Sequence, residues 1–586
     1  MAAGPPLSAA GAPLSTVGAG PAPRTVLAFG IAGARTALAA HVHPHAHQHL
    51  VLLLHQWCPA QALFDAPDEA TQQAWPPPLD GWHPLALQGG RGQLTLVVGP
   101  LQASLKALDA AVDHFELTGL PMPADAALLK ALGRCAAPGA TVAALPGQPG
   151  LLDSWRAGLR SAGFVLAAGE PLRGAYAPPA TVRRTSPRAG PRSRRAQASV
   201  AVIGAGLAGA WAAHALQQQG WSVTVFDRHP QPAQEASGNP AGLFHGTVNA
   251  DDGAHARFHR AAALLAARTL RPWIAQGTVP GAIDGLLRLA SAGESVGDLQ
   301  ALINRHALPA DYVQALDAAQ ASARAGIVLD RPAWFYPGGG WVEPPALVRL
   351  LLRDTPFEGD CDVARIEPAS GGWRLLNAHD HLIAETEQLV LANSADAARL
   401  WPQGGWPMGC SRGQISLWPE PPPDAPWPRL PVAGGGYVLR LPDGALLCGA
   451  TAAPGDDEPM LRAADHQHNG QRLQQLTGWA GPLAPAGRVG WRANTVDRLP
   501  LVGPVAAVMA NPPTAWRDLA RVPGLYVLSG LGARGLTWGP LAGRLLAAWV
   551  SGAPMPVPAA LRDAVDPGRW QLRSARRGSV NAEAQA

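Results

Sequence analysis

The sequence predicts an α/β protein of two domains, an amino-terminal Rossmann-like domain and a carboxy-terminal α+β domain. Three observations support this fold class. With 586 residues, 47% of them hydrophobic and 15% charged, the chain is too long for one core and apolar enough for two. Strand-like and helical runs alternate between Thr25 and about Tyr176. A second α/β unit begins abruptly at Val200, after a stretch rich in arginine and proline.

The expected domain boundaries follow these changes in composition. Residues 1–22 are rich in Gly, Pro, Ala and Ser, and we expect a disordered lead. Residues 23–178 form the first domain. Residues 179–198 contain no acid, and we interpret them as a linker, a solvated tether being favoured over a basic strap that touches phosphates. Residues 199–573 form the second domain, and we expect the polar residues 574–586 to be a frayed tail.

Composition excludes several classes of protein. The net charge is only +4, and no apolar run approaches the roughly 20 residues of a membrane span, so we expect a cytoplasmic protein. The five cysteines are scattered, which indicates buried free thiols rather than disulfides or a zinc site. Alternating histidines occupy positions 41, 43, 45, 47 and 49. With Pro44 among them and no second cluster, a solvated loop is favoured and no metal site is expected.

A complete βαβ nucleotide-binding pattern opens the second domain. After an apolar strand come the turn glycines Gly204, Gly206 and Gly209, an Ala-rich helix, and a second strand that ends in Asp227. The glycines allow a tight turn and close approach of a pyrophosphate, whose charge the helix N-terminus stabilises. Asp227 is placed for a ribose hydroxyl. The motif alone does not separate FAD from NAD.

Further segments resemble the D-amino-acid-oxidase superfamily and, more closely, the oxidase half of the bifunctional MnmC family, which modifies wobble uridine in tRNA. They are Ala236 to Gly242 (ASGNPAG), Tyr336 to Trp341 (YPGGGW), Leu389 to Ser394 (LVLANS), Gly490 to Gly503 and Gly530 to Thr537. We expect the second of these to open a helix. The resemblance covers most of residues 199–570 in the family's order. Ser394 stands where such flavoproteins often keep a glycine.

The resemblance implies that FAD is the cofactor. In it, residues 530–537 form a second glycine turn before a helix and aim backbone N–H groups at the flavin ring, where reduced flavin gathers negative charge. An ordinary helix start is the alternative. The cofactor-binding residues implied are Gly204, Gly206, Gly209, Asp227, Ser237, Gly238, Asn239, Gly242, Val363, Gly530, Gly532, Arg534, Gly535, Leu536 and Thr537.

The resemblance also implies a catalytic-site residue, Arg492. Related oxidases hold a substrate carboxylate at this position, and a planar guanidinium suits a carboxylate better than lysine does. A surface salt bridge is the alternative. The reaction implied moves a hydride from the carbon between amine and carboxylate to the flavin, and water then splits the resulting imine.

The first domain resembles the methyltransferase part of the same family, which uses S-adenosylmethionine. The scaffold segments kept in order are Pro76 to Leu79, Trp82 and His83, Ala136 to Thr141 and Arg156 to Phe164.

The residues that carry methyl transfer in that family are replaced in this chain. Ala28-Phe29-Gly30-Ile31-Ala32 replaces a glycine-rich turn, and His55 stands where a ribose acid is expected. Thr118 replaces an active-site Asp, and the Asn-Pro after it is missing. We therefore expect methyl transfer to be weak or absent.

The leading hypothesis is an FAD-dependent oxidoreductase of tRNA wobble uridine. It converts 5-carboxymethylaminomethyl-(2-thio)uridine to 5-aminomethyl-(2-thio)uridine. A following methylation of this product with S-adenosylmethionine stays open but is not favoured. A small-molecule amine or amino-acid oxidase and a non-catalytic tRNA-binding flavoprotein are the alternatives. The fusion to a methyltransferase-like domain favours tRNA as partner, and the intact glycine turns favour catalysis. No obligatory protein partner is evident.

Overall fold

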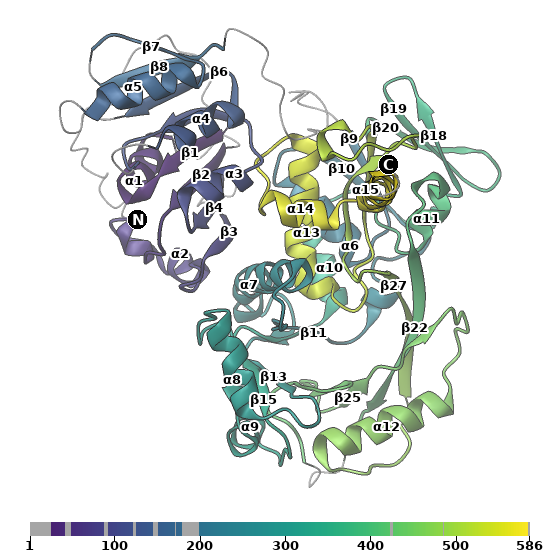
Figure 1. Ribbon diagram of the computed structural model, residues 1–586. Helices are drawn as coiled ribbons and strands as arrows, with labels where there is room; N and C mark the ends of the chain where they lie inside the picture. The colour runs from purple at the N-terminus through teal and green to yellow at the C-terminus, as the bar shows by residue number, and fades with distance from the viewer. Residues whose placement is uncertain are drawn as a thin grey trace, which may run out of the picture.

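The computed structural model has two α/β parts that pack against each other (Figure 1). It describes residues 25–41, 48–86, 92–120, 125–144, 151–169, 171–178, 199–421, 426–484 and 486–583. The lead and the linker expected from the sequence, and the histidines at positions 43, 45 and 47, lie outside these ranges. In the described ranges, no helix is both long and apolar enough to cross a membrane.

An eight-stranded sheet forms the amino-terminal part, in the order β3-β4-β2-β1-β5-β6-β8-β7. The central strands β4, β2, β1, β5 and β6 are parallel. The strands are β1 (Thr25–Phe29), β2 (Gln48–Leu54), β3 (Gly81–Ala86), β4 (Gly92–Val98), β5 (Val112–Glu116), β6 (Ala136–Ala144), β7 (Phe164–Leu166) and β8 (Leu172–Tyr176), and the helices are α1 (Gly30–His41), α2 (Glu69–Ala74), α3 (Leu101–Ala107), α4 (Ala126–Cys135) and α5 (Leu151–Ser161). Parallel strands joined by helical crossovers confirm the expected Rossmann-like fold.

A six-stranded sheet organises the carboxy-terminal part and contains the βαβ unit. Its order is β17-β10-β9-β21-β29-β28, and all neighbours are parallel except β28 and β29. Its elements are β9 (Ser199–Ile203), α6 (Leu207–Gln217), β10 (Ser222–Phe226), β17 (Phe357–Glu358), β21 (Gln388–Leu391), β28 (Leu501–Ala506), β29 (Arg521–Ser529) and α13 (Gly535–Ser551). Both α6 and α13 begin at the carboxyl ends of parallel strands, where α/β sheets bind ligands.

A nine-stranded sheet, almost entirely antiparallel, forms the second layer of this part. Its strands are β13 (Leu286–Leu289), β14 (Gln314–Leu316), β15 (Ala333–Tyr336), β22 (Met408–Trp418), β23 (Val432–Ala433), β24 (Tyr437–Arg440), β25 (Leu446–Gly449), β26 (Ala453–Pro454) and β27 (Ala486–Thr495), with helices α8 (Val296–Arg305), α9 (Ala318–Ala325) and α12 (Ala463–Thr477) along it (Figure 1). The combination of a parallel nucleotide-binding sheet and an antiparallel one confirms the expected α+β domain.

Smaller elements complete the carboxy-terminal part. They are α7 (Ala254–Ala275), α10 (Pro344–Leu351), α11 (Asp396–Leu400), α14 (Ala559–Val565), α15 (Arg569–Glu583), the sheet β11 (Gly242–Phe244), β16 (Gly340–Val342) and β12 (Gly281–Ala282), and the sheet β18 (Arg365–Ala369), β19 (Gly372–Leu376) and β20 (Leu382–Thr386).

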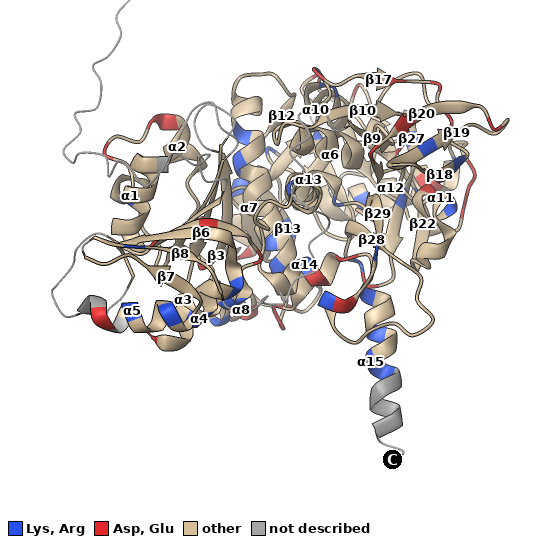
Figure 2. Ribbon diagram, turned by 90° about the horizontal axis from the view of Figure 1, so that it is seen from above, with Lys and Arg blue, Asp and Glu red and all other residues tan. Residues whose placement is uncertain are grey.

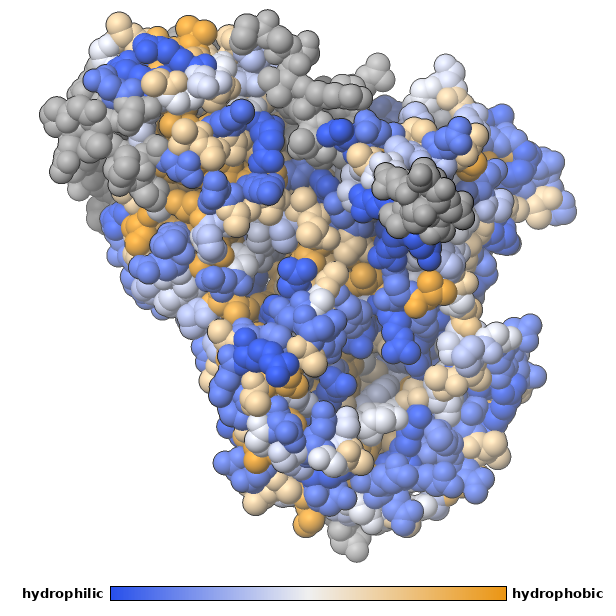
Figure 3. Space-filling view, in the orientation of Figure 1, coloured by the Kyte–Doolittle hydropathy of each residue, from blue (hydrophilic) through white to orange (hydrophobic). Residues whose placement is uncertain are grey.

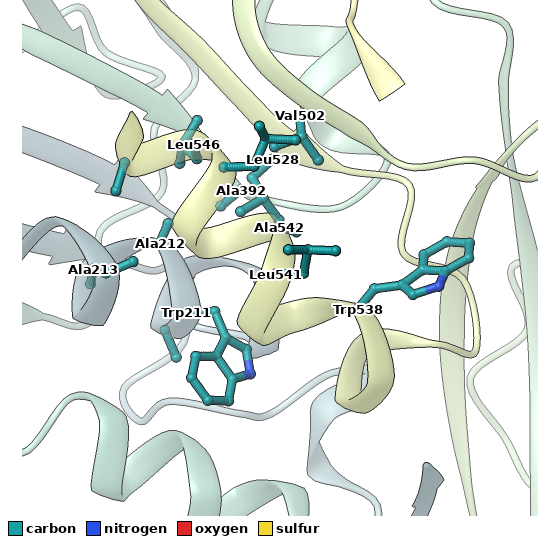
Figure 4. Packing of buried hydrophobic residues seen from close by; sticks show 14 of the residues in the cluster. Trp211, Ala212, Ala213, Ala392, Val502, Leu528, Trp538, Leu541, Ala542 and Leu546 are labelled. Carbon is teal, nitrogen blue, oxygen red and sulfur yellow. The ribbon is translucent and has the colours of Figure 1, made fainter. Parts of the chain in front are cut away.

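The packing of α13 against α6 and the six-stranded sheet forms the main core. Leu541, Ala542 and Leu546 point from α13 toward Ala392, Val502 and Leu528 on or beside the strands, and Trp211 of α6 lies against the same helix (Figure 4). A Cβ at Gly543 would lie 2.5 Å from the backbone oxygen of Trp211. Glycine there therefore allows the two helices to approach closely.

Two expectations about local structure are wrong. The segment from Tyr336 to Trp341 does not open a helix. It contains the end of β15, the turn at residues 337–339 and the start of β16, and α10 begins only at Pro344. The residues from Ser574 to Glu583 are not a frayed tail, because they continue α15. That helix is fixed at its start by Arg569, whose guanidinium donates to Asp497 at 2.9 Å.

Candidate active site

One cavity of about 510 Å³ lies between the two sheets of the carboxy-terminal part. The ends of β9, β10, β21 and β29 border it on one side, and strands β24 and β27 of the antiparallel sheet border it on the other. Its volume is in the range of sites that hold a cofactor or a small ligand. Most residues predicted to bind the cofactor line it. These are Gly204, Gly206, Asp227, Ser237, Asn239, Gly242, Val363, Gly530, Gly532, Arg534, Gly535, Leu536 and Thr537.

The first glycine turn connects β9 to α6 at one end of the cavity. Gly204 has φ +106°, and a Cβ there would lie 2.7 Å from the backbone oxygen of Ala392 on the neighbouring strand. The Asp227 carboxylate accepts hydrogen bonds from the N–H groups of Ala205 at 2.6 Å and His229 at 2.9 Å. The acid at the end of β10 thus holds the glycine turn in place and faces the cavity.

Two predicted glycines do not line the cavity. A Cβ at Gly209 would overlap the backbone oxygen of Gly204, so this glycine allows α6 to pack onto its own turn. Gly238 lies against Arg488, whose guanidinium donates to Asn239 Oδ1 at 3.2 Å and to the oxygen of Gln234. Both glycines therefore allow close packing next to the cavity without lining it.

Ser237 faces the N-terminus of α6. Its hydroxyl accepts a hydrogen bond from the N–H of Leu207 at 3.0 Å and keeps its own proton to donate. A Cβ at Gly206 would lie 3.0 Å from this hydroxyl. The helix start therefore presents N–H and O–H donors, a chemistry that suits a phosphate.

The second glycine turn connects β29 to α13. Gly530 and Gly532 have φ of +70° and +54°, and the N–H of Gly532 donates to the oxygen of Ala493 at 2.9 Å. This bond and a bridge between Leu531 and Asn494 tie the turn to the end of β27. The N-terminus of α13 therefore faces the cavity beside the strand that carries Arg492.

Arg492 lies in the cavity wall on β27, opposite Ser411 of β22. A Cβ at Gly413 of β22 would collide with its guanidinium, so glycine there makes the room. Burial lowers the pKa of Arg492. The nearby Tyr437 oxygen raises this pKa, and the positive charge of Arg472 lowers it further. No described residue makes a hydrogen bond or an ion pair with the Arg492 guanidinium. A half-buried guanidinium that faces a cavity without a described acidic partner suits an anionic ligand, such as a substrate carboxylate.

The cavity also contains functional candidates that the sequence did not indicate. Arg288, His245, His259 and Tyr437 line it. Burial raises the pKa of Tyr437 to about 12, so its hydroxyl keeps its proton and remains a hydrogen-bond donor near Arg492. Arg288 and Tyr437 belong to strands β13 and β24 and carry no local motif, so only the sheet pairing brings them here.

His259 orients Arg534, the residue that precedes α13. The indole N–H of Trp538 can only donate, and it donates to His259 Nδ1 at 2.9 Å. His259 Nε2 therefore carries the ring proton and donates to the oxygen of His245 at 2.8 Å. Burial and then Arg534 lower the pKa of His259 well below its ordinary value, which keeps the ring neutral. Arg534 donates to the same Nδ1 at 3.3 Å.

In the amino-terminal part, the replaced positions pack against one another. A Cβ at Gly30, φ +62°, would lie 2.6 Å from the oxygen of Gly119, so the turn after β1 lies directly on the loop after β5. Glu116 accepts hydrogen bonds from the N–H and hydroxyl of Thr118, and burial raises its pKa. His55 follows β2 directly, as predicted. This loop thus presents a threonine whose N–H and hydroxyl are both bonded to the Glu116 carboxyl group.

The five cysteines are free thiols, and three of them are buried: Cys58, Cys135 and Cys448. Among the described residues there is no group of three or more His, Cys, Asp or Glu side chains placed to hold a metal ion.

Comparison with known proteins gives consistent matches to this arrangement. Residues 199–549 match the family model of FAD dependent oxidoreductases. The chain is 45% identical over 537 residues to the tRNA 5-methylaminomethyl-2-thiouridine biosynthesis bifunctional protein MnmC of Methylibium petroleiphilum, covering 86% of this chain and 81% of the relative. The protein with the same description from Paraburkholderia phytofirmans is 36% identical, covering 88% and 82%.

Solved structures match the carboxy-terminal part. Iminodiacetate oxidase from Chelativorans sp. BNC1 is 26% identical with a TM-score of 0.50, and the match covers 61% of this chain and 97% of that one. L-proline dehydrogenase from P. horikoshii is similar in fold, with a TM-score of 0.51 at 15% identity over 64% and 98% of the two chains.

Proposed function

Because the chain belongs to the MnmC family, and its residues 199–549 to the FAD-dependent oxidoreductase family, we propose that it removes the carboxymethyl group from 5-carboxymethylaminomethyl-(2-thio)uridine in tRNA. The products are 5-aminomethyl-(2-thio)uridine and glyoxylate. The observation that carries this proposal is the buried Arg492 guanidinium, which faces the dinucleotide cavity without a described acidic partner. Such a group selects an amine substrate that bears a carboxylate.

FAD fits the residues around the cavity. The turn from Gly204 to Gly206 and the Ser237 hydroxyl offer donors to the pyrophosphate, and Asp227 offers an acceptor to the ribose. Residues 530–537 and the start of α13 lie at the other turn, where their N–H groups would face the ring. When bound, FAD supplies the two-electron acceptor for oxidation of a carbon–nitrogen bond.

The protein's own residues bind and orient the substrate. Arg492 pairs with the carboxylate, and the protonated Tyr437 hydroxyl donates a second hydrogen bond to it. Both groups stand on the antiparallel sheet, across the cavity from the parallel strand ends. The methylene carbon between carboxylate and amine is thereby held between the two sheets. Holding the substrate carbon in a reactive position beside the flavin accounts for a large part of the rate enhancement, because the oxidation needs little acid–base catalysis.

The same chain is proposed to carry out methyl transfer weakly or not at all. Support comes from Ala28 at the end of β1 and Ala32 at the start of α1, from His55 after β2, and from Thr118 in place of an acid. Glu116 lies next to Thr118, but its carboxylate accepts two hydrogen bonds from that residue and its pKa is raised by burial. We therefore propose that the amino-terminal part serves as a packing module for the oxidase and not as a user of S-adenosylmethionine.

One experiment tests both parts of the proposal. The purified protein is incubated with tRNA that carries the carboxymethylaminomethyl group, with and without S-adenosylmethionine, and nucleosides are identified by mass spectrometry. We expect the aminomethyl nucleoside in both samples, together with glyoxylate. A methylaminomethyl product formed as fast as the substrate disappears would restore methyl transfer. Oxidation of free glycine or iminodiacetate, with no reaction on tRNA, would instead identify a small-molecule oxidase.

A further inference from the structure

The junction between the two parts of the chain contains two arginines without acidic partners. Arg268 lies on α7 and Arg544 on α13, and both helices belong to the carboxy-terminal part. Strand β3 of the amino-terminal part packs against α7, and Arg268 Nη2 reaches the oxygen of Pro84 on that strand at 3.5 Å. The two guanidinium groups are therefore located where the parts meet, away from the residues proposed to bind FAD.

Three of their donor atoms are buried and unsatisfied. Nε and Nη1 of Arg268 and Nη1 of Arg544 are shielded from solvent, and none of them has a hydrogen-bond partner among the described residues. Guanidinium donor atoms that are shielded from solvent without a partner are destabilising, and the charge of the neighbouring Arg544 acts against that of Arg268 as well. The fold therefore requires something negative or strongly polar between them.

No carboxylate of the described chain fills this role. Neither arginine makes an ion pair with a described Asp or Glu, and outside the described ranges the only acids are Glu170 and Asp424. Residues 87–91, which follow the β3 strand, contain none. Other cationic or neutral groups complete the surroundings, because His83 of β3 lies near Arg268 and His214 of α6 lies near Arg544.

Burial and the two arginine charges lower the pKa values of all four basic groups at this junction. Burial and the neighbouring Arg544 lower the pKa of Arg268 to about 9, and burial lowers that of Arg544 to about 10. Burial and then Arg268 lower the pKa of His83 to about 4, and burial and then Arg544 do the same for His214. Both histidines are therefore neutral at pH 7, and the two arginines carry the positive charge.

We propose that Arg268 and Arg544 bind a small inorganic anion, such as chloride or phosphate, at the junction of the two parts. The anion accepts hydrogen bonds from the unsatisfied guanidinium donors and cancels their repulsion. It thereby holds α7 and α13 together beneath β3. The site is a structural one and does not depend on the reaction proposed above.

Full-length protein is unfolded by heat at constant ionic strength while potassium gluconate is replaced stepwise by chloride or by inorganic phosphate. A bound anion stabilises the native state, so we expect the midpoint to rise by about 2 °C for each tenfold increase in the anion that binds. The R268M and R544M variants should lose this dependence. R257M, which removes an exposed arginine of the same helix, should keep it. Figure 2 shows the blue basic positions along α7.

Crystals grown in bromide provide the direct measurement. An anomalous peak within hydrogen-bond distance of both guanidinium groups is expected, or a tetrahedral density there if phosphate is the ligand. The proposal is overturned if the midpoint of the wild-type protein is the same in gluconate, chloride and phosphate and the density between the arginines contains only water.

Discussion

Arg492 is the residue on which the proposed chemistry depends, because it offers the cavity a buried charge that no described side chain neutralises. We expect Arg492→Leu to retain bound flavin and its absorption spectrum but to lower kcat/KM for the carboxymethylaminomethyl substrate by about 30- to 1000-fold, the loss of one charge-assisted pair. Stopped-flow measurement of flavin reduction gives this number. Arg305→Leu, on α8 and outside the cavity lining, is the control. A decrease of less than threefold would place the carboxylate elsewhere.

Ser394 is a strained residue beside the same cavity. Its φ of +59° is a left-handed conformation that glycine adopts freely and serine does not, which explains why a glycine is common at this position in related flavoproteins. We expect Ser394→Gly to stabilise the protein by roughly 1 kcal/mol, seen as a higher midpoint of thermal unfolding. Ser394→Ala keeps the Cβ and the strain, so it should show no gain. An equal gain in both variants would refute the explanation.

At the scale of the elements, site residues within one contiguous motif could be predicted from the sequence, but residues brought together by pairing of distant strands could not. Gly204, Gly206 and Asp227 lie within one βαβ unit, so their spacing alone predicted where they meet. Arg288 and Tyr437 reach the cavity only because β13 and β24 join the same sheet through β23. Neither residue carries a local pattern, and no periodicity could have indicated it.

The two wrong expectations have the same origin. The glycines between Tyr336 and Trp341 resemble a turn before a helix, but strand pairing with β11 and β12 makes the following residues a strand. The polar composition after Ser574 indicates an exposed segment, but it does not reveal that Arg569 and Arg573 both bind Asp497, more than 70 residues earlier. Tertiary contacts decided both cases.

The attachment of α15 should depend on pH. Burial opposes the charge of Asp497, but hydrogen bonds and the charge of Arg569 outweigh it and lower the pKa to about 2. Because the folded pKa lies below the unfolded value, this carboxylate stabilises the fold by about 2 kcal/mol above pH 4 and loses that contribution as the pH falls toward 2. We expect Asp497→Asn to lower the unfolding midpoint at pH 6. The difference from wild type should shrink steadily below pH 4, and a constant difference would contradict the assignment.

At the scale of the whole molecule, most of the visible face is hydrophilic, and orange residues gather on the amino-terminal lobe (Figure 3). Segments of that lobe contact the oxidase part, and the lobe is the one proposed above to have lost the residues of methyl transfer. Leu79, at the end of a retained proline motif, packs in one cluster with Leu243 and Leu264 of the carboxy-terminal part. Packing contacts such as that of Leu79, in a lobe without the proposed methyl-transfer residues, support a role for this lobe in stabilising the oxidase part.

A buried polar link between the parts is the pair of Asp109 and Arg562. The two side chains are 6% and 5% exposed. The backbone oxygen of Asp109 also accepts a hydrogen bond from the backbone N–H of Met555 at 3.0 Å. Asp563 also binds Arg562, so Asp109→Asn removes only the carboxylate of the other part from this buried pair, at a cost of about 1–3 kcal/mol. We expect Asp109→Asn to uncouple the parts, so that a single calorimetric transition becomes two, with the amino-terminal part unfolding first.

The control for this variant removes an ion pair that does not join the parts. Glu385 and Arg374 pair on the surface with side chains 61% and 41% exposed, so Glu385→Gln should change the free energy of unfolding by less than about 1 kcal/mol and keep the original transition shape. Oxidation of the tRNA substrate by Asp109→Asn should persist at temperatures between the two transitions if the amino-terminal part only supports the oxidase. Loss of activity at the first transition would instead give that part a direct role in binding tRNA, because the cavity and Arg492 belong wholly to the part that is still folded.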